Sequence, residues 1–245
     1  MFPVYIKDKD FQEPEDSAYY LVADNGTFLV KNMGLYSSSI RLEGSHLLTQ
    51  DEHVKLRFGM IPESLICTIL GFFRTAFLWH GGEAIVFLYY SQNDRSFCVK
   101  VPPQQVFRRM NGRGMYLHTD THVTYDACER PRQFIKLGTI HSHADGSAYH
   151  SCTDSNDEKH EDGLHITIGQ VQSKQPDLSV SFVVNGKRFM LKPEEILDGY
   201  GNYEPVDPPA SWIWQITCIV ESNGMIVRKK LRYGQHKANT GLPST

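Results

Sequence analysis

The stretch from His141 to Asp154, HSHADGSAYHSCTD, concentrates side chains that bind metal ions and transfer protons. Successive side chains of a β-strand point to opposite faces, so His141 and His143 would lie on the same face of a strand. Two imidazoles on one face are suited to bind a single ion. A hydrolytic zinc site needs three protein ligands and one position open for water. A turn at Gly146 would let Asp154 supply the third ligand.

The elements around this stretch must place its side chains. LGTIHSH, residues 137–143, reads as a strand that ends in the two histidines. Further along, Ser151-x-x-Asp154 has the spacing of a capping box, in which a serine stabilises the first turn of a helix. Such a cap would also orient the aspartate, so the structural and the metal-binding interpretations are compatible.

The full pattern resembles the signature of the JAMM, or MPN-plus (JAB/Mov34/PAD), zinc metallopeptidases. In this chain that signature is His141-Ser142-His143, the seven residues ADGSAYH, and then Ser151-Cys152-Thr153-Asp154, with no departure. The family also has an upstream glutamate near the end of the first helix or the start of the next strand. Glu83, in the sequence GGEA, occupies that place.

The resemblance covers about residues 54–198. The N-terminal part and the sequence VPPQ at 101–104 are most similar in layout to bacterial, often plasmid-borne members. These members are grouped with ThiF/E1-like adenylating proteins and include the PRTRC system protein A type. The resemblance therefore implies a ThiF/E1-like protein from the same operon as a partner.

The resemblance implies a role for each site residue. His141, His143 and Asp154 would bind one Zn²⁺ per chain. Glu83 would take a proton from the attacking water and pass it to the leaving amine, and Ser151 would hydrogen-bond the developing oxyanion. The implied activity is that of a zinc-dependent isopeptidase or peptidase. Its substrate would be the C-terminal amide of a ubiquitin-like protein, in deconjugation or precursor processing.

Two alternative functions stay open. A non-catalytic MPN scaffold would dock partner proteins, but such domains usually lack one or more zinc ligands, and this chain has all of them. A JAMM hydrolase with the same chemistry would act instead on a sulfur-carrier protein or a small peptide-like adduct.

Other candidate residues have simpler interpretations. Glu63 begins a predicted helix, where a carboxylate interacts favourably with the helix dipole. The sequence HEDGLH at 160–165 has the wrong spacing for the H-E-x-x-H motif of thermolysin-like peptidases. His150 and Cys152 are interpreted as local hydrogen-bonding or packing residues.

The hydrophobic pattern predicts an α/β (α+β) fold with a mixed sheet, and the JAMM resemblance implies that this sheet is MPN-like and flanked by helices. We expect a β-rich extension at 1–53, a metallopeptidase domain at 54–199, and a linker with a C-terminal segment at 200–245. Asn25-Gly26 predicts a hairpin between AYYLVA and TFLVKN, with SSSIRLEG as a third strand. A strand at 54–60 and a helix ending at His80-Gly81-Gly82 should follow. SWIWQITCIV, residues 211–220, is compatible with either a strand or a helix.

Composition narrows the class of protein. The chain has 245 residues and a formal net charge of −3, and no large basic footprint predicts nucleic-acid binding. The longest apolar stretch, 65–79, is too short to span a bilayer and contains Arg74. The five scattered cysteines predict neither a disulfide framework nor a zinc ribbon. With no apolar signal-peptide core near the N-terminus, we expect a cytoplasmic protein without a membrane partner.

Overall fold

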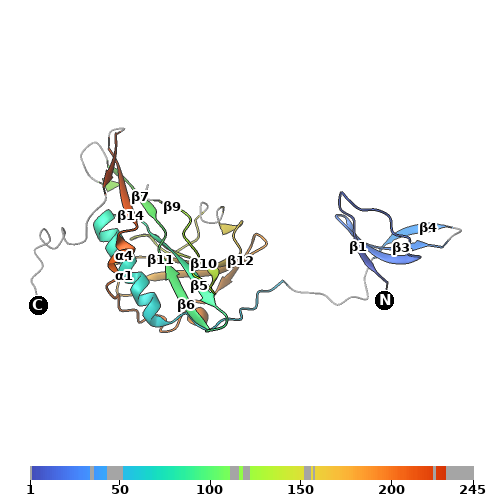
Figure 1. The fold of residues 1–245 in the computed structure, drawn as a ribbon, viewed down its shortest axis with the longest axis horizontal. Coiled ribbons are helices and arrows are strands. Elements are labelled where there is room, and N and C mark those ends of the chain that lie inside the picture. The colour runs from blue at the N-terminus through green and yellow to red at the C-terminus, as the bar shows by residue number, and fades with distance from the viewer. Residues whose placement is uncertain are drawn as a thin grey trace, which may run out of the picture. The chain divides into compact units, whose positions relative to one another are not determined.

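The computed structural model describes residues 2–33, 36–42, 52–110, 116–117, 122–151, 156, 158–222 and 225–229. By its internal contacts the chain divides into two compact units, Met1–Glu52 and His53–Thr245, which we call unit 1 and unit 2 (Figure 1). The fold is mixed α+β, with three mixed sheets and few helices among the described residues.

Unit 1 contains a four-stranded sheet. Its strands, in spatial order, are β1 (Val4–Ile6), β2 (Ala18–Ala23), β3 (Gly26–Asn32) and β4 (Ser37–Arg41). Ala23 pairs with Gly26, so the hairpin turns at Asp24-Asn25, one residue before the predicted Asn25-Gly26, and Gly26 begins β3 with a positive φ of 135° that favours glycine. The predicted hairpin and third strand are therefore confirmed. Tyr19, Leu21 and Val30 form the core of this unit.

Unit 2 is built on a six-stranded sheet with the order β13-β12-β11-β10-β5-β6. The strands are β5 (Ile85–Ser91), β6 (Ser96–Lys100), β10 (Ile135–Ser142), β11 (Gly163–Gly169), β12 (Asp177–Val184) and β13 (Lys187–Leu191). Only the pair β10–β11 is parallel, and the other neighbours are antiparallel. The two central strands are buried along most of their length, so the sheet is covered on both faces there.

One helix supports this sheet. α1 (Glu63–His80) begins after Pro62 with an acidic residue in its first turn and ends at Gly81, which has the left-handed conformation (φ 66°). Its apolar stripe, which includes Ile66, Leu70 and Phe73, packs in one core with the inward side chains of β5, β10 and β11. The predicted helix and its glycine stop are confirmed. No helix in the described part of the chain is long and apolar enough to cross a membrane.

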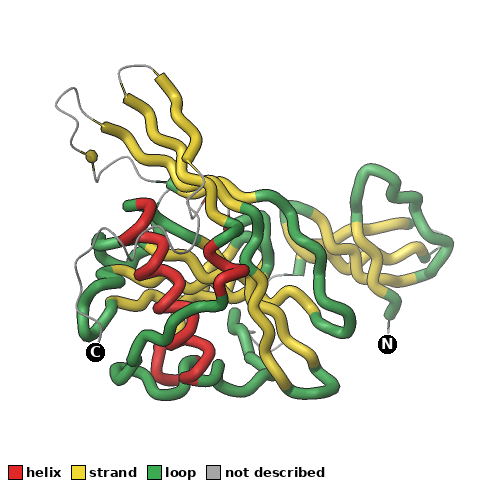
Figure 2. The backbone as a smooth tube through the Cα atoms, turned by 60° about the vertical axis from the view of Figure 1, so that its left-hand side comes forward, coloured by secondary structure: helices red, strands yellow, loops and turns green. Residues whose placement is uncertain are grey.

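A five-stranded sheet completes unit 2 and extends from its body in Figure 2. Its strands are β7 (Gln104–Met110), β8 (Tyr116–Leu117), β9 (Val123–Tyr125), β14 (Ile216–Ser222) and β15 (Met225–Lys229). β14 pairs in parallel with β7, so chain after residue 200 contributes directly to this unit. Two short helices, α3 (Pro193–Ile196) and α4 (Ala210–Ile213), lie between β13 and β14.

One predicted segment, 54–60, is wrong, and the structure settles the open assignment of another, 211–220. The predicted strand at 54–60 is wrong, because no ladder forms there. Leu56 and Phe58 of that segment pack on the core of unit 2, so their alternation reflects contact with the core without a partner strand. The apolar run SWIWQITCIV is both helix and strand, since α4 ends at Ile213 and β14 begins at Ile216.

Candidate metal centre

The two faces of the six-stranded sheet differ in chemistry. On the face toward α1, β11 presents Leu164, Ile166 and Ile168 to the core. The opposite face carries polar side chains that the strand register places side by side: His141 beside Thr167, and Thr139 beside His165. These four side chains are buried. Because buried polar groups are costly unless they are hydrogen-bonded, this face is the candidate site of the molecule.

His141 and His143 lie at the end of β10 on this polar face. His141 pairs with Ile85 on one side and Thr167 on the other, and the backbone N–H of His143 donates to the carbonyl of Ile168 at 2.9 Å. Their ring centroids are 5.1 Å apart, with the ring planes at 51°. Two imidazoles on one tetrahedral zinc, with Zn–N near 2.0 Å, have centroids about 5 Å apart. The histidine pair therefore fits a shared ion.

The hydrogen bond of His143 favours one tautomer. Its Nδ1 lies 3.1 Å from the carbonyl oxygen of Ser147, and a carbonyl only accepts, so Nδ1 carries the proton. Nε2 then keeps its lone pair for a metal ion, an arrangement typical of histidine ligands in metalloproteins. Tyr149 packs edge-on against the same ring, at a centroid distance of 5.0 Å.

The loop that supplies the Ser147 carbonyl is itself closely held. The N–H of Gly146 donates to the carbonyl of His143 at 2.8 Å, and Ala144 has a positive φ of 52°, which is uncommon for a residue with a side chain. Gly169, at the end of β11, lies directly under the loop. A Cβ on Gly169 would lie 2.4 Å from the backbone nitrogen of Ala148. Only glycine lets the strand and loop approach this closely.

Gly169→Ala is therefore expected to displace the loop and loosen His143. We expect zinc affinity to fall about 10-fold to 100-fold, in the range found for lost ligand-orienting contacts, and unfolding free energy to fall by about 1–3 kcal/mol. Competition with a chromophoric chelator and thermal unfolding measure the two effects. Gly59→Ala is the control, since nothing lies within 4 Å of an added Cβ there. Wild-type zinc affinity in Gly169→Ala would show that the loop does not hold the histidine.

Glu83 precedes β5, the strand that pairs with β10 beside His141. The N–H of Ser142 donates to the carbonyl of Ala84 at 2.9 Å, and the N–H of Ala84 donates to Ser142 Oγ at 3.0 Å. The last pair of the β5–β10 ladder is His141 with Ile85, so half-buried Glu83 lies just beyond the ladder, at the end where His143 follows β10.

Of the remaining predicted residues, the structure describes Ser151. Ser151 is half-buried and follows His150 directly. Asp154, the predicted third ligand, lies outside the described residues, as does Cys152. Within the described part of the chain, no three His, Cys, Asp or Glu side chains are grouped to bind a metal ion. The site thus brings together the two histidines, and the hydrogen bonds between Ala84 and Ser142 bring the segment before β5, which contains Glu83, to the same end of β10.

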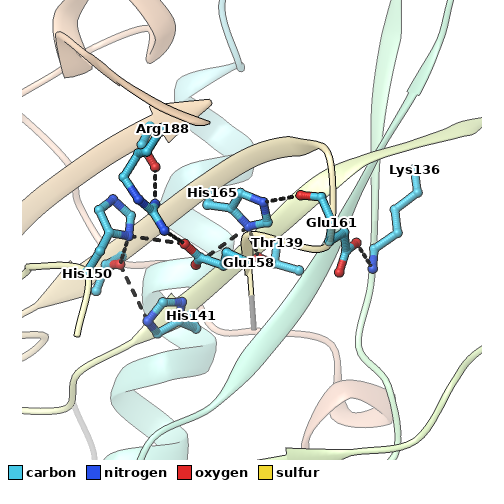
Figure 3. A network of polar contacts seen from close by, with 10 residues as sticks. Lys136, Thr139, His141, His150, Glu158, Glu161, His165 and Arg188 are labelled. Atoms are coloured by element: carbon cyan, nitrogen blue, oxygen red, sulfur yellow. Dashed lines mark hydrogen bonds and ion pairs between the residues drawn. The ribbon is translucent and has the colours of Figure 1, made fainter. Parts of the chain in front are cut away.

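Next to the histidine pair lies a buried network of polar side chains (Figure 3). The motif did not predict this network. Thr167 Oγ1 lies 3.4 Å from His141 Nε2 and 3.4 Å from His150 Nδ1. His150 was expected to form only local contacts, yet its ring reaches β11. A sequence pattern that could have predicted this polar network lies in LHITIG, residues 164–169. There, polar residues alternate with apolar ones, in a strand that is buried throughout. That alternation indicates a polar buried face.

His165 is neutral in this network. It is fully buried, and burial lowers the pKa of His165, although the nearby Glu158 carboxylate opposes that shift. Its Nε2 lies 3.0 Å from the carbonyl oxygen of Glu161 and so carries the proton. Its Nδ1 then accepts the hydroxyl proton of Thr139 at 2.9 Å. The ring is satisfied by these two bonds without becoming charged.

Comparisons with family models and with curated proteins found no relative of this chain. No family model matches the chain, and no curated protein matches it. The functional assignment therefore depends on the motif and on the geometry of this face.

Proposed function

We propose that this chain is a zinc-dependent peptidase or isopeptidase of the JAMM type. The observation that carries the proposal is the pairing of buried His141 and half-buried His143 on one polar face, with ring centroids 5.1 Å apart. The contact of His143 Nδ1 with the Ser147 carbonyl, which places the proton on Nδ1, supports it. The MPN-like identity of the six-stranded sheet with α1 is part of the same proposal.

Each residue then has a defined task. His141, His143 and Asp154 would hold the zinc ion, which supplies Lewis-acid chemistry by polarising a carbonyl and acidifying water. The Glu83 carboxylate would accept the proton of the attacking water and deliver it to the leaving amine. Ser151 Oγ would donate a hydrogen bond to the developing oxyanion. Burial of the polar face strengthens these interactions, because it keeps bulk water from the neighbouring groups.

The substrate class proposed is the C-terminal tail of a ubiquitin-like protein, joined by an amide to a lysine or to a short extension. The JAMM resemblance is what supports this class. An extended tail can be bound by main-chain hydrogen bonds along a strand, which suits a flexible, glycine-containing segment. A ThiF/E1-like adenylating protein, which would activate such a tail, is the proposed partner.

The purified full-length protein is expected to contain one zinc per chain and to lose its activity with a chelator. Metal content is measured by atomic absorption, and activity with a panel of ubiquitin-like proteins that carry a fluorogenic amide on the C-terminal glycine. Activity should return when zinc is added back. Absence of stoichiometric zinc would favour the scaffold alternative, whereas zinc without cleavage of any tail would favour a different amide substrate.

A further inference from the structure

A buried carboxylate is the centre of the network beside the histidine pair. Glu158 is 7% exposed and faces groups from three parts of unit 2. Arg188 of β13 donates to its Oε2 through Nη2. The same oxygen lies 3.5 Å from His150 Nδ1, and Oε1 lies 3.6 Å from His165 Nδ1. A buried carboxylate needs a compensating charge, so these contacts decide whether the arrangement is stable.

Arg188 provides that charge. Because neutral His165 turns a lone pair toward Glu158, it contributes no positive charge to the carboxylate. Arg188 is itself held in place, since its Nη1 donates to Ser181 Oγ of β12 at 2.5 Å. Its place in the sheet follows from register: Arg188 pairs with Val183, on the face that also carries Ser181, His165 and His141. The guanidinium therefore fixes Glu158 to the rigid sheet.

His150 links the same carboxylate to the histidine pair. Its side chain is only 6% exposed, and its Nδ1 contacts both Glu158 Oε2 and Thr167 Oγ1. Thr167 Oγ1 in turn lies 3.4 Å from Nε2 of His141. Figure 3 shows Glu158 between Arg188 and the two histidines His150 and His165. A continuous chain of polar contacts thus runs from β13 to His141.

The contact between His150 and Glu158 joins two separate positions of the chain. They stand on either side of the segment 151–157, which contains Ser151 and Asp154. Their side chains meet over the polar face, so His150 and Glu158 are held together and against the sheet.

We propose that Glu158 and Arg188 are positioning residues for the zinc site, which clamp His150 against the sheet beside His141. The inference rests on the proposed zinc function, and neither residue is assigned a role in the chemical step. Glu158 orients His150 and, through Thr167, His141. Arg188 supplies the counter-charge that keeps the Glu158 carboxylate in this buried position.

The test is metal binding by full-length Glu158→Gln, which keeps the shape of the side chain and removes its charge. Zinc affinity of the metal-free protein is measured by competition with a chromophoric chelator, and ligand geometry from the visible ligand-field bands of bound Co²⁺. We expect zinc to bind about 10-fold to 100-fold more weakly, with altered Co²⁺ bands. Glu195→Gln is the matched control, because Glu195 pairs with Lys192 on the exposed surface.

A second variant keeps the test decisive if Glu158→Gln fails to fold. Arg188→Lys retains a positive charge but loses the two-pronged contact with Glu158 and Ser181. It is expected to weaken zinc binding by a smaller factor and to shift the Co²⁺ bands in the same direction. A general loss of stability would lower the melting temperature of the metal-free protein and leave these bands unchanged.

The outcomes separate this inference from the proposed function. If the wild-type protein binds neither zinc nor Co²⁺, the zinc function and the clamp are both overturned. If the wild type binds the metal and the folded variants bind it equally well with the same spectrum, only the clamp is overturned. Weaker binding with altered bands in the variants, and no change in Glu195→Gln, supports the clamp.

Discussion

Glu83→Gln is expected to retain one zinc per chain and the wild-type melting temperature while losing nearly all turnover. Glutamine has almost the same shape as glutamate but does not accept a proton at neutral pH. General acid–base catalysis contributes about 100-fold to 10,000-fold, so we expect kcat/KM to fall by a factor in that range. Because Glu83 precedes β5 and lies outside the β5–β10 ladder, the change should leave the sheet intact.

The control for this prediction is Glu63→Gln. Glu63 lies in the first turn of α1, where the loss of its charge is expected to cost only about 0.3–1 kcal/mol of stability through the helix dipole. Steady-state kinetics and metal analysis are run on both variants. Full activity in Glu83→Gln would contradict its assignment, and loss of activity in Glu63→Gln alone would transfer the proton-shuttle role to the other glutamate.

His141→Ala is expected to lose both bound zinc and activity. The proposed site, with three protein ligands, would be left with two, and activity should fall to the background of the metal-free protein. The side chain is buried, so the variant also removes packing and a contact with Thr167. Metal analysis after dialysis, together with the peptidase assay, measures the effect. By the JAMM resemblance, Asp154→Ala should behave in the same way.

The control for metal loss is His160→Ala. His160 is exposed and lies outside the polar face, so its removal should leave zinc content and activity unchanged. Far-UV circular dichroism of both variants shows whether the fold is retained. Stoichiometric zinc in a folded His141→Ala protein would exclude His141 as a ligand, and the proposed centre would then need a different set of donors.

Local rules were sufficient for much of the fold. The hairpin of β2 and β3, the apolar stripe of α1 and the stop at Gly81 depend on residues close together in the chain, and each was predicted correctly, although the hairpin turns one residue earlier than Asn25-Gly26. Local rules were insufficient where contacts with distant parts of the chain decide the secondary structure of a segment. Leu56 and Phe58 alternate as in a strand but pack on the core without a ladder, and the run 211–220 divides into α4 and β14 where β7 offers an edge.

The sequence by itself determined the pairing of His141 with His143, because a two-residue spacing on a strand places both rings on one face. It also carried the motif that names Glu83, Ser151 and Asp154, through a resemblance. Only the tertiary structure brought Thr167, Glu158 and Arg188 to the same face. Their arrangement depends on the register of β10 to β13, which is set by contacts between residues far apart in the chain, and spacing in the sequence does not encode such contacts.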